Sequence, residues 1–156
     1  IGYRARKHTD LIDLENINYY KKEPFWEKVT SNDLTSEGLV LNPDEFYILA
    51  SREFIKIPET HAAEMIAYDT KVGEFRAHYA GFFDPGFGLI KNGINQTRAV
   101  LEVRSHDVPF LIEEGQTVCR LVYEKMSTPP KQVYGGKGIL SNYQSQGLKL
   151  SKHFVN

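Results

Sequence analysis

Apolar and polar side chains alternate along two stretches in the second half of the chain. Across residues 99–104 every second side chain is apolar, and the intervening positions are largely polar. A later stretch places Cys119, Leu121 and Tyr123 on one face in the same way. A period of two residues is typical of a β-strand with one buried face. The pattern therefore predicts two strands, with a turn at residues 113–116 between them.

Shorter apolar runs in the first half are separated by turn-forming residues. The runs at residues 45–50 and 53–58 are predicted to be strands, and residues 42–44 carry an Asn-Pro-Asp turn signal. Residues 59–69 could hold a helical turn, and their pattern leaves this open. Many short strands, turn signals at intervals of about 8 to 12 residues and no long amphipathic helix predict an all-β sandwich or barrel.

The two ends of the chain differ from its centre. Residues 1–38 are mixed and polar, and we expect a connecting segment that the only tryptophan, Trp26, anchors on the domain. Residues 39–134 form the predicted β domain. Residues 135–156 contain four glycines and are expected to form a mobile tail.

Composition narrows the classes of protein. With 156 residues, 41% hydrophobic and 25% charged, the chain suits one globular domain. A net charge of −1 gives no general affinity for nucleic acid or anionic membrane. The single cysteine, Cys119, excludes an internal disulfide and fits a reducing compartment such as the cytoplasm. Because it lies on the apolar face of its strand, we interpret it as a packing residue.

The polar residues match few of the known catalytic motifs. One cysteine and five scattered histidines do not supply a zinc ligand set, and the P-loop, dinucleotide and serine-hydrolase motifs are absent. Carboxylates remain. Glu102 stands in mid-strand between Leu101 and Val103, where it is either a residue on a wet face or a rigidly held acid–base group. Asp84, in the stretch HYAGFFDPGFG at residues 78–88, could simply begin a turn or could face a ligand.

The order of several motifs resembles the dCTP deaminase branch of the dUTPase-like superfamily. The resemblance runs from about residue 39 to 153 and rests on EFYILASREFIKIP, AGFFDPGFG, AVLEVRS, VPFLIEEGQTVCRLVYEKM and NYQSQG, in that order. More closely, the chain resembles the second half of a tandem bacterial form with two such units in one polypeptide. That relationship would explain a start at Ile1. It implies a distorted β-sandwich or jelly roll, with active sites where subunits meet, usually in trimers or with the preceding homologous half.

The resemblance also implies a reaction. Ammonia would be lost hydrolytically from the cytosine of dCTP, giving dUTP, without zinc and with Mg²⁺ bound only together with the triphosphate. Glu102 matches the family's catalytic glutamate. It would take a proton from the water that attacks C4 and pass protons to N3 and the leaving amine, which is typically worth about 10²–10⁴ in rate.

A nucleotide-binding surface is implied beside the Asp-Pro-Gly turn and the tail. Asp84 could reach a deoxyribose hydroxyl, and a ring such as Phe83 would leave no room for a 2′-OH. The expected nucleotide-binding residues are Lys71, Arg76, Ala80, Gly81, Phe83, Asp84, Tyr143 and Gln146.

The chain departs from the family where the phosphates should bind. In place of Ser-Ser-x-Ala-Arg-x-Gly it reads AYDTKVGEFRAH, in which Thr70, Lys71 and Arg76 are partial substitutes. The family's His-Arg pair becomes Gly81-Phe82. Either the site is composite, with serine and arginine from a partner half, or this unit is a non-catalytic nucleotide-binding or assembly unit. A dUTP diphosphatase is a lower-ranked alternative, because residues 45–54 lack the aspartate that would position its metal.

Overall fold

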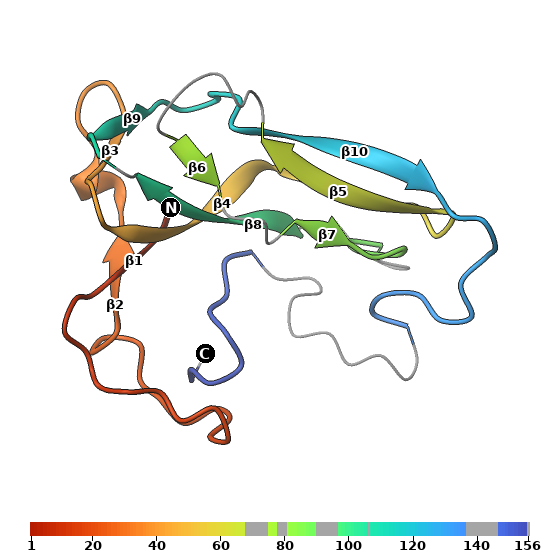
Figure 1. The fold of residues 1–156 in the computed structure, drawn as a ribbon, viewed down its shortest axis with the longest axis horizontal. Coiled ribbons are helices and arrows are strands. Elements are labelled where there is room, and N and C mark those ends of the chain that lie inside the picture. Colours follow the sequence, from red (N-terminus) through yellow and green to blue (C-terminus); the bar gives the residue numbers. More distant parts are fainter. Residues whose placement is uncertain (68–74, 78–80, 90–96, 106, 137–146, 156) are drawn as a thin grey trace.

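Strands make up nearly all of the regular structure in the computed structural model (Figure 1). The structure describes residues 1–67, 75–77, 81–89, 97–105, 107–136 and 147–155. In these residues there are ten strands, one 3-10 turn at Ser31–Asp33 and no α-helix. No helix in this described part is long and apolar enough to cross a membrane. The prediction of an all-β fold is confirmed.

The strands form three sheets in which every pairing is antiparallel. The largest has the order β2-β1-β4-β8-β6, with strands Trp26–Val29, Gly2–Ala5, Phe46–Phe54, Arg98–Ser105 and Phe75–Ala77. The second has the order β10-β5-β7, with strands Cys119–Lys125, His61–Ala67 and Phe82–Phe83. A smaller sheet pairs β3 (Leu39–Leu41) with β9 (Phe110–Ile112). The stretch whose pattern was left open, residues 59–69, contains β5.

The main core lies between the two larger sheets. Ala99, Leu101 and Val103 of β8 are at most 5% exposed, so the period-two prediction for this strand is confirmed. They form one cluster with Leu49 of β4 and with Met65 of β5, which comes from the facing sheet. Burial of these apolar side chains holds the layers together and fixes which face of β8 points inward.

A second apolar cluster covers the opposite face of the largest sheet. Ile48 of β4 and Val100 of β8 project from that face and pack with Leu150 and Phe154 near the end of the chain. Trp26 lies edge-on to Phe154, with ring centroids 6.3 Å apart. Trp26 therefore anchors the N-terminal segment on the domain, as its apolar bulk indicated.

The predicted limits of the domain at residues 38 and 134 stay predictions. The structure adds that β1 and β2, from the first segment, hydrogen-bond into the same sheet as β4. It also adds that Leu150 and Phe154 of the tail are 1% and 2% exposed. Both ends of the chain thus contribute to the packed body, and the mobility of the tail stays a prediction.

One strand prediction was wrong in its division. The runs at residues 45–50 and 53–58 were expected to be two strands, but β4 is continuous to Phe54 with a register shift after Ala50. Arg98 stabilises this irregularity by donating to the carbonyls of two β4 residues at 2.5 Å each. Beyond β4, the backbone of residues 55–57 hydrogen-bonds to segments outside the named strands.

Candidate active site

Glu102 lies in the middle of β8, directly across from Ile48 of β4. Opposite residues of an antiparallel pair project on the same face, so Glu102 points away from the main core. Its side chain is half-buried. The second cluster packs on this face and includes Leu148 and Leu150 of the C-terminal segment. A rigid central strand therefore holds this carboxylate, and part of its surface stays open.

The Asp-Pro-Gly segment forms a tight turn directly after β7. The amide of Phe87 donates to the carbonyl of Asp84 at 3.1 Å. Gly86 has φ +93°, and a Cβ at this position would lie 2.9 Å from the Cβ of Val133. The amide of Tyr134 donates to a turn carbonyl at 2.8 Å. Glycine is required here because another segment of the same chain packs against the turn.

The phenylalanines of this segment divide between core and surface. Phe83 and Phe87 are 6% and 8% exposed, and their ring centroids lie 5.0 Å apart in an edge-on contact. Phe82 is 79% exposed. Asp84 is also exposed, and residues two apart on an extended chain project to the same side. Packing thus accounts for Phe83, and its predicted nucleotide contact stays a prediction.

The other predicted nucleotide-binding residues are only partly visible. Gly81 is buried against β5, where its carbonyl accepts from the amide of Met65 at 2.6 Å and an added Cβ would lie 2.8 Å from the Cβ of Met65. Arg76 lies in β6 opposite Arg104 of β8, and its side chain is not described. Four of the predicted residues lie outside the described part of the chain: Lys71, Ala80, Tyr143 and Gln146.

A short segment after β4 connects the Asp84 turn to β8. Ile57 exchanges two backbone hydrogen bonds, of 2.8 and 3.2 Å, with the turn, and the amide of Ile55 donates to the carbonyl of Thr97 at 2.8 Å. Thr97 is the residue before β8, so the turn lies near the start of that strand. Glu102 stands four residues beyond the first residue of β8, which corresponds to about 13 Å along a strand. The two predicted carboxylates come from different sheets and are linked through this segment.

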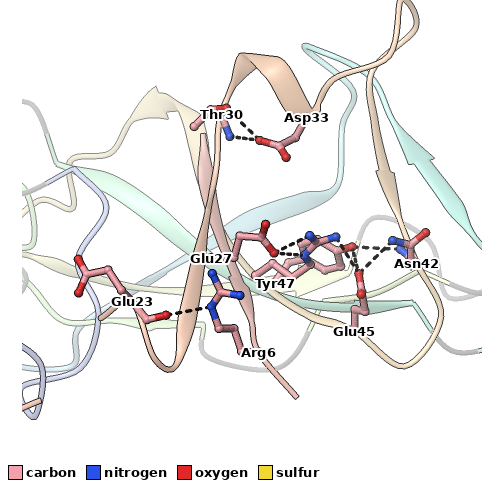
Figure 2. A network of polar contacts seen from close by, with 9 residues as sticks. Arg6, Glu23, Glu27, Thr30, Asp33, Asn42, Glu45 and Tyr47 are labelled. Atoms are coloured by element: carbon pink, nitrogen blue, oxygen red, sulfur yellow. Dashed lines mark hydrogen bonds and ion pairs between the residues drawn. The ribbon is translucent and has the colours of Figure 1, made fainter. Parts of the chain in front are cut away.

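A polar network joins β1, β2 and β4 (Figure 2). Arg4 Nη2 lies 2.6 Å from Glu27 Oε2, and Arg4 Nη1 lies 3.5 Å from Glu45 Oε2. The Tyr47 hydroxyl donates to Glu45 at 2.5 Å, and the Asn42 side-chain amide donates to it at 3.0 Å. Burial, the largest influence, raises the pKa of Glu45, but these hydrogen bonds and the charge of Arg4 outweigh it, so the pKa lies below its ordinary value. The network fixes β4, the strand that pairs with β8.

A cleft of about 980 Å³ opens beside β4, β8 and the loop that precedes β10. Arg52, Arg98 and Cys119 are among its lining residues, whereas neither Glu102 nor Asp84 lines it. Burial, followed by the charge of a nearby glutamate, raises the pKa of the Cys119 thiol. Because a nucleophilic cysteine requires a lowered pKa, the packing interpretation of Cys119 is supported. The cleft is therefore separate from the predicted acid–base site.

Over residues 1–154, the chain matches the family described as "2'-deoxycytidine 5'-triphosphate deaminase (DCD), C-terminal domain". A protein of Methanobrevibacter smithii named "dCTP deaminase, dUMP-forming" is 30% identical over 144 residues, which cover 90% of this chain and 66% of that protein. A protein of the same name from Persephonella marina is 25% identical over 148 residues, covering 94% of this chain and 73% of the relative.

Among solved structures, the 2'-deoxycytidine 5'-triphosphate deaminase of Agrobacterium tumefaciens is 51% identical and gives a TM-score of 0.74. The match covers 84% of this chain and 38% of that chain. The chain thus spans 66% of the Methanobrevibacter relative and well under half of the Agrobacterium chain.

Proposed function

The chain belongs to the family defined by the C-terminal domain of 2′-deoxycytidine 5′-triphosphate deaminase, and on this ground we propose that it takes part in the hydrolytic deamination of dCTP. The observation that carries the proposal is the family match over residues 1–154, within which Glu102 occupies the middle of a central strand. The substrate is a pyrimidine deoxynucleoside triphosphate, and the leaving group is the 4-amino group of cytosine. The single cysteine is the reason for proposing a cytoplasmic location.

Glu102 is proposed as the acid–base group. Its carboxylate takes a proton from water as the water oxygen adds to C4. Glu102 then passes this proton to N3 of the ring. A proton then passes through Glu102 from the new hydroxyl to the amine, the C4–N4 bond breaks and ammonia leaves. Proton transfer needs a distance of about 2.6–3.2 Å between the carboxylate oxygen and the atom that gives or takes the proton. The central position of Glu102 in β8 supports this role, because a rigid strand can hold the carboxylate at such a distance.

The substrate is proposed to lie between the Glu102 face of β8 and the C-terminal segment. Leu148 and Leu150 pack with residues of that face, so the chain immediately after Gln146 returns beside Glu102. Tyr143 and Gln146 are therefore placed in sequence to close over a bound base or sugar. Asp84 is proposed to accept a hydrogen bond from the deoxyribose hydroxyl, with the Ala80–Gly81 backbone, Phe83, Lys71 and Arg76 as further contacts.

Magnesium is proposed to arrive with the triphosphate. No three His, Cys, Asp or Glu side chains of the described residues form a group that could hold a metal ion. We propose that phosphate oxygens and water would hold an Mg²⁺ ion, as is common for this ion. It would neutralise phosphate charge, and the proton transfers at C4 would remain with Glu102.

The product is proposed to be dUTP, with dUMP as the second candidate. Loss of ammonia alone leaves the triphosphate intact. The two relatives named dUMP-forming support a version of the reaction that also releases pyrophosphate. Separating dUTP from dUMP and pyrophosphate by ion-exchange chromatography decides between the two outcomes.

The site is proposed to be composite, formed where this unit meets a homologous unit in a trimer or pseudo-trimer. Residues 67–78 contain Arg76 but lack the Ser-Ser pair, and they carry no arginine in the register of the family motif. An arginine fork is the group that suits a triphosphate best. The Agrobacterium chain contains much sequence beyond the matched part, and such a partner half could supply the missing serine and arginine. A non-catalytic nucleotide-binding or assembly unit is the alternative if the partner half carries a complete site.

Ammonia release from dCTP tests the composite site directly. We expect weak or no release by the 156-residue chain alone. Adding the unmatched part of the Agrobacterium protein should increase release at least tenfold. Full activity of the isolated chain would contradict the composite site, and no ammonia from either sample would contradict deamination by this unit.

A further inference from the structure

Strand β10 forms a long edge of its sheet among the described residues. It pairs with β5 along all seven of its residues, Cys119–Lys125. On its other side no strand of the described residues pairs with it, and Figure 1 shows it at the outer margin of its sheet. The edge strands β2, β6 and β7 span only four, three and two residues. Short edge strands discourage pairing with other chains, whereas a regular edge of seven residues invites it.

The residues of β10 are symmetric in character about Val122. Arg120 and Glu124 stand two positions to either side, and Leu121 and Tyr123 stand one position to either side. A two-fold axis at Val122 would run two copies of β10 antiparallel. It would place Arg120 opposite Glu124 and Leu121 opposite Tyr123 of the second copy. Every central cross-strand pair is then of a favourable kind, apolar with apolar or opposite in charge.

The exposure of these side chains agrees with such a contact. Val122 is 41% exposed and Tyr123 is 46% exposed. Arg120 and Glu124 are exposed as well. Neither proline, glycine nor a bulge interrupts the strand, and its only lysine is Lys125, the last residue. Of the devices that protect an edge strand, proline, a bulge and short length are therefore absent from β10, and its charged residues are Arg120, Glu124 and Lys125.

We propose that β10 is a docking strand for a second copy of this chain. Two copies pair antiparallel about Val122, and the two three-stranded sheets join into one continuous six-stranded sheet. The backbone groups of both edges are satisfied, and the Arg120–Glu124 pairs select the antiparallel register over a parallel one, which would oppose like charges. This contact is a two-fold one, so it doubles whatever assembly forms through other surfaces.

Charge reversal at the two ends of the contact tests the proposal. Arg120→Glu and Glu124→Arg each place like charges opposite one another twice. We expect each variant to have half the wild-type mass in sedimentation equilibrium, with association weakened about tenfold or more. An equimolar mixture of the two variants restores opposite charges at both positions, and so does the double variant. Both should regain the wild-type mass. Lys28→Glu on β2 changes the net charge as much as Arg120→Glu does and should leave the mass unchanged.

A crosslink provides a second measurement that does not depend on charge. In a Cys119→Ser background, Val122→Cys places two thiols across the axis, within the Cα separation of about 4.4–6.8 Å that a disulfide bridges. Mild oxidation should give a covalent dimer, and Lys28→Cys in the same background should not. A wild-type mass equal to that of the single-charge variants, a mixture that does not regain mass, or no crosslink at Val122 would each overturn the proposal. Circular dichroism confirms that each variant is folded.

Discussion

Tyr47 shows how one hydroxyl is used inside the largest sheet. The residue is 1% exposed, and its hydroxyl donates to Glu45 and accepts from the backbone amide of Asn42 at 3.2 Å. Burial first, and then the bond to Glu45, raise the pKa of Tyr47. Glu45 also faces Arg4, so the hydroxyl belongs to the network that holds β4 in place. β4 is the strand that pairs with β8, which carries Glu102.

Replacing Tyr47 with phenylalanine isolates this hydroxyl. Tyr47→Phe keeps the ring in the core and leaves a charged acceptor and a backbone donor without their partner, so we expect a loss of about 1–2 kcal/mol of unfolding free energy in urea. Tyr19→Phe is the matched control, because that side chain is 66% exposed and lies outside β10. Equal stability of the two variants would show that the Tyr47 hydroxyl has no structural role.

At the residue scale, the sequence predicted the turn at Asp84, which the structure contains, and did not predict which aromatic ring is exposed; the role of Glu102 stays a prediction. Phe83 was expected to face the nucleotide, whereas Phe82 is the exposed ring. Which of two neighbouring rings points outward depends on how the short strand β7 sits on β5, and that is set by the contact of Gly81 with Met65. A contact between segments that are distant in the sequence produces no local sequence pattern, so it could not be predicted.

Both β8 and β4 were predicted as strands, but only β8 was predicted with its buried face, and the extent of β4 was not predicted. β8 alternates because one of its faces is buried in the main core, whereas Val100 and Glu102 on its other face are only half-buried. Three successive residues of β4, Tyr47, Ile48 and Leu49, are all at most 9% exposed, because each face of that strand meets a cluster. A continuous apolar run has no period, so neither its length nor its bulge could be predicted.

The Asp-Pro-Gly turn provides a test at the scale of elements. Gly86→Ala forces a side chain into a left-handed conformation at φ +93° and against Val133, so we expect a cost of about 1–3 kcal/mol and a lower melting temperature. Gly147→Ala is the control, because an added Cβ there meets no atom within 4 Å. If the two variants have the same melting temperature, residues 133–134 do not restrain the turn.

For the whole molecule, the site could be predicted only through the order of its motifs. Composition and charge excluded whole classes of protein but named no substrate. The structure then placed the C-terminal segment on the Glu102 face, which no spacing in the sequence indicated. Family membership and this placement together lead to the claim that one carboxylate on a central strand transfers protons at a cytosine ring.

The most direct test of that claim separates dCTP binding from its chemistry. The sample is this chain mixed with the unmatched part of the Agrobacterium protein. Calorimetry measures dCTP binding and a coupled assay measures ammonia release, for wild type, Glu102→Gln and Glu64→Gln. Glu64 is the matched control, since it is also half-buried in mid-strand, in β5. We predict that Glu102→Gln binds dCTP about as tightly as wild type and releases ammonia about 10²–10⁴-fold more slowly, while Glu64→Gln keeps both properties. Ammonia release by Glu102→Gln at the wild-type rate would contradict the account.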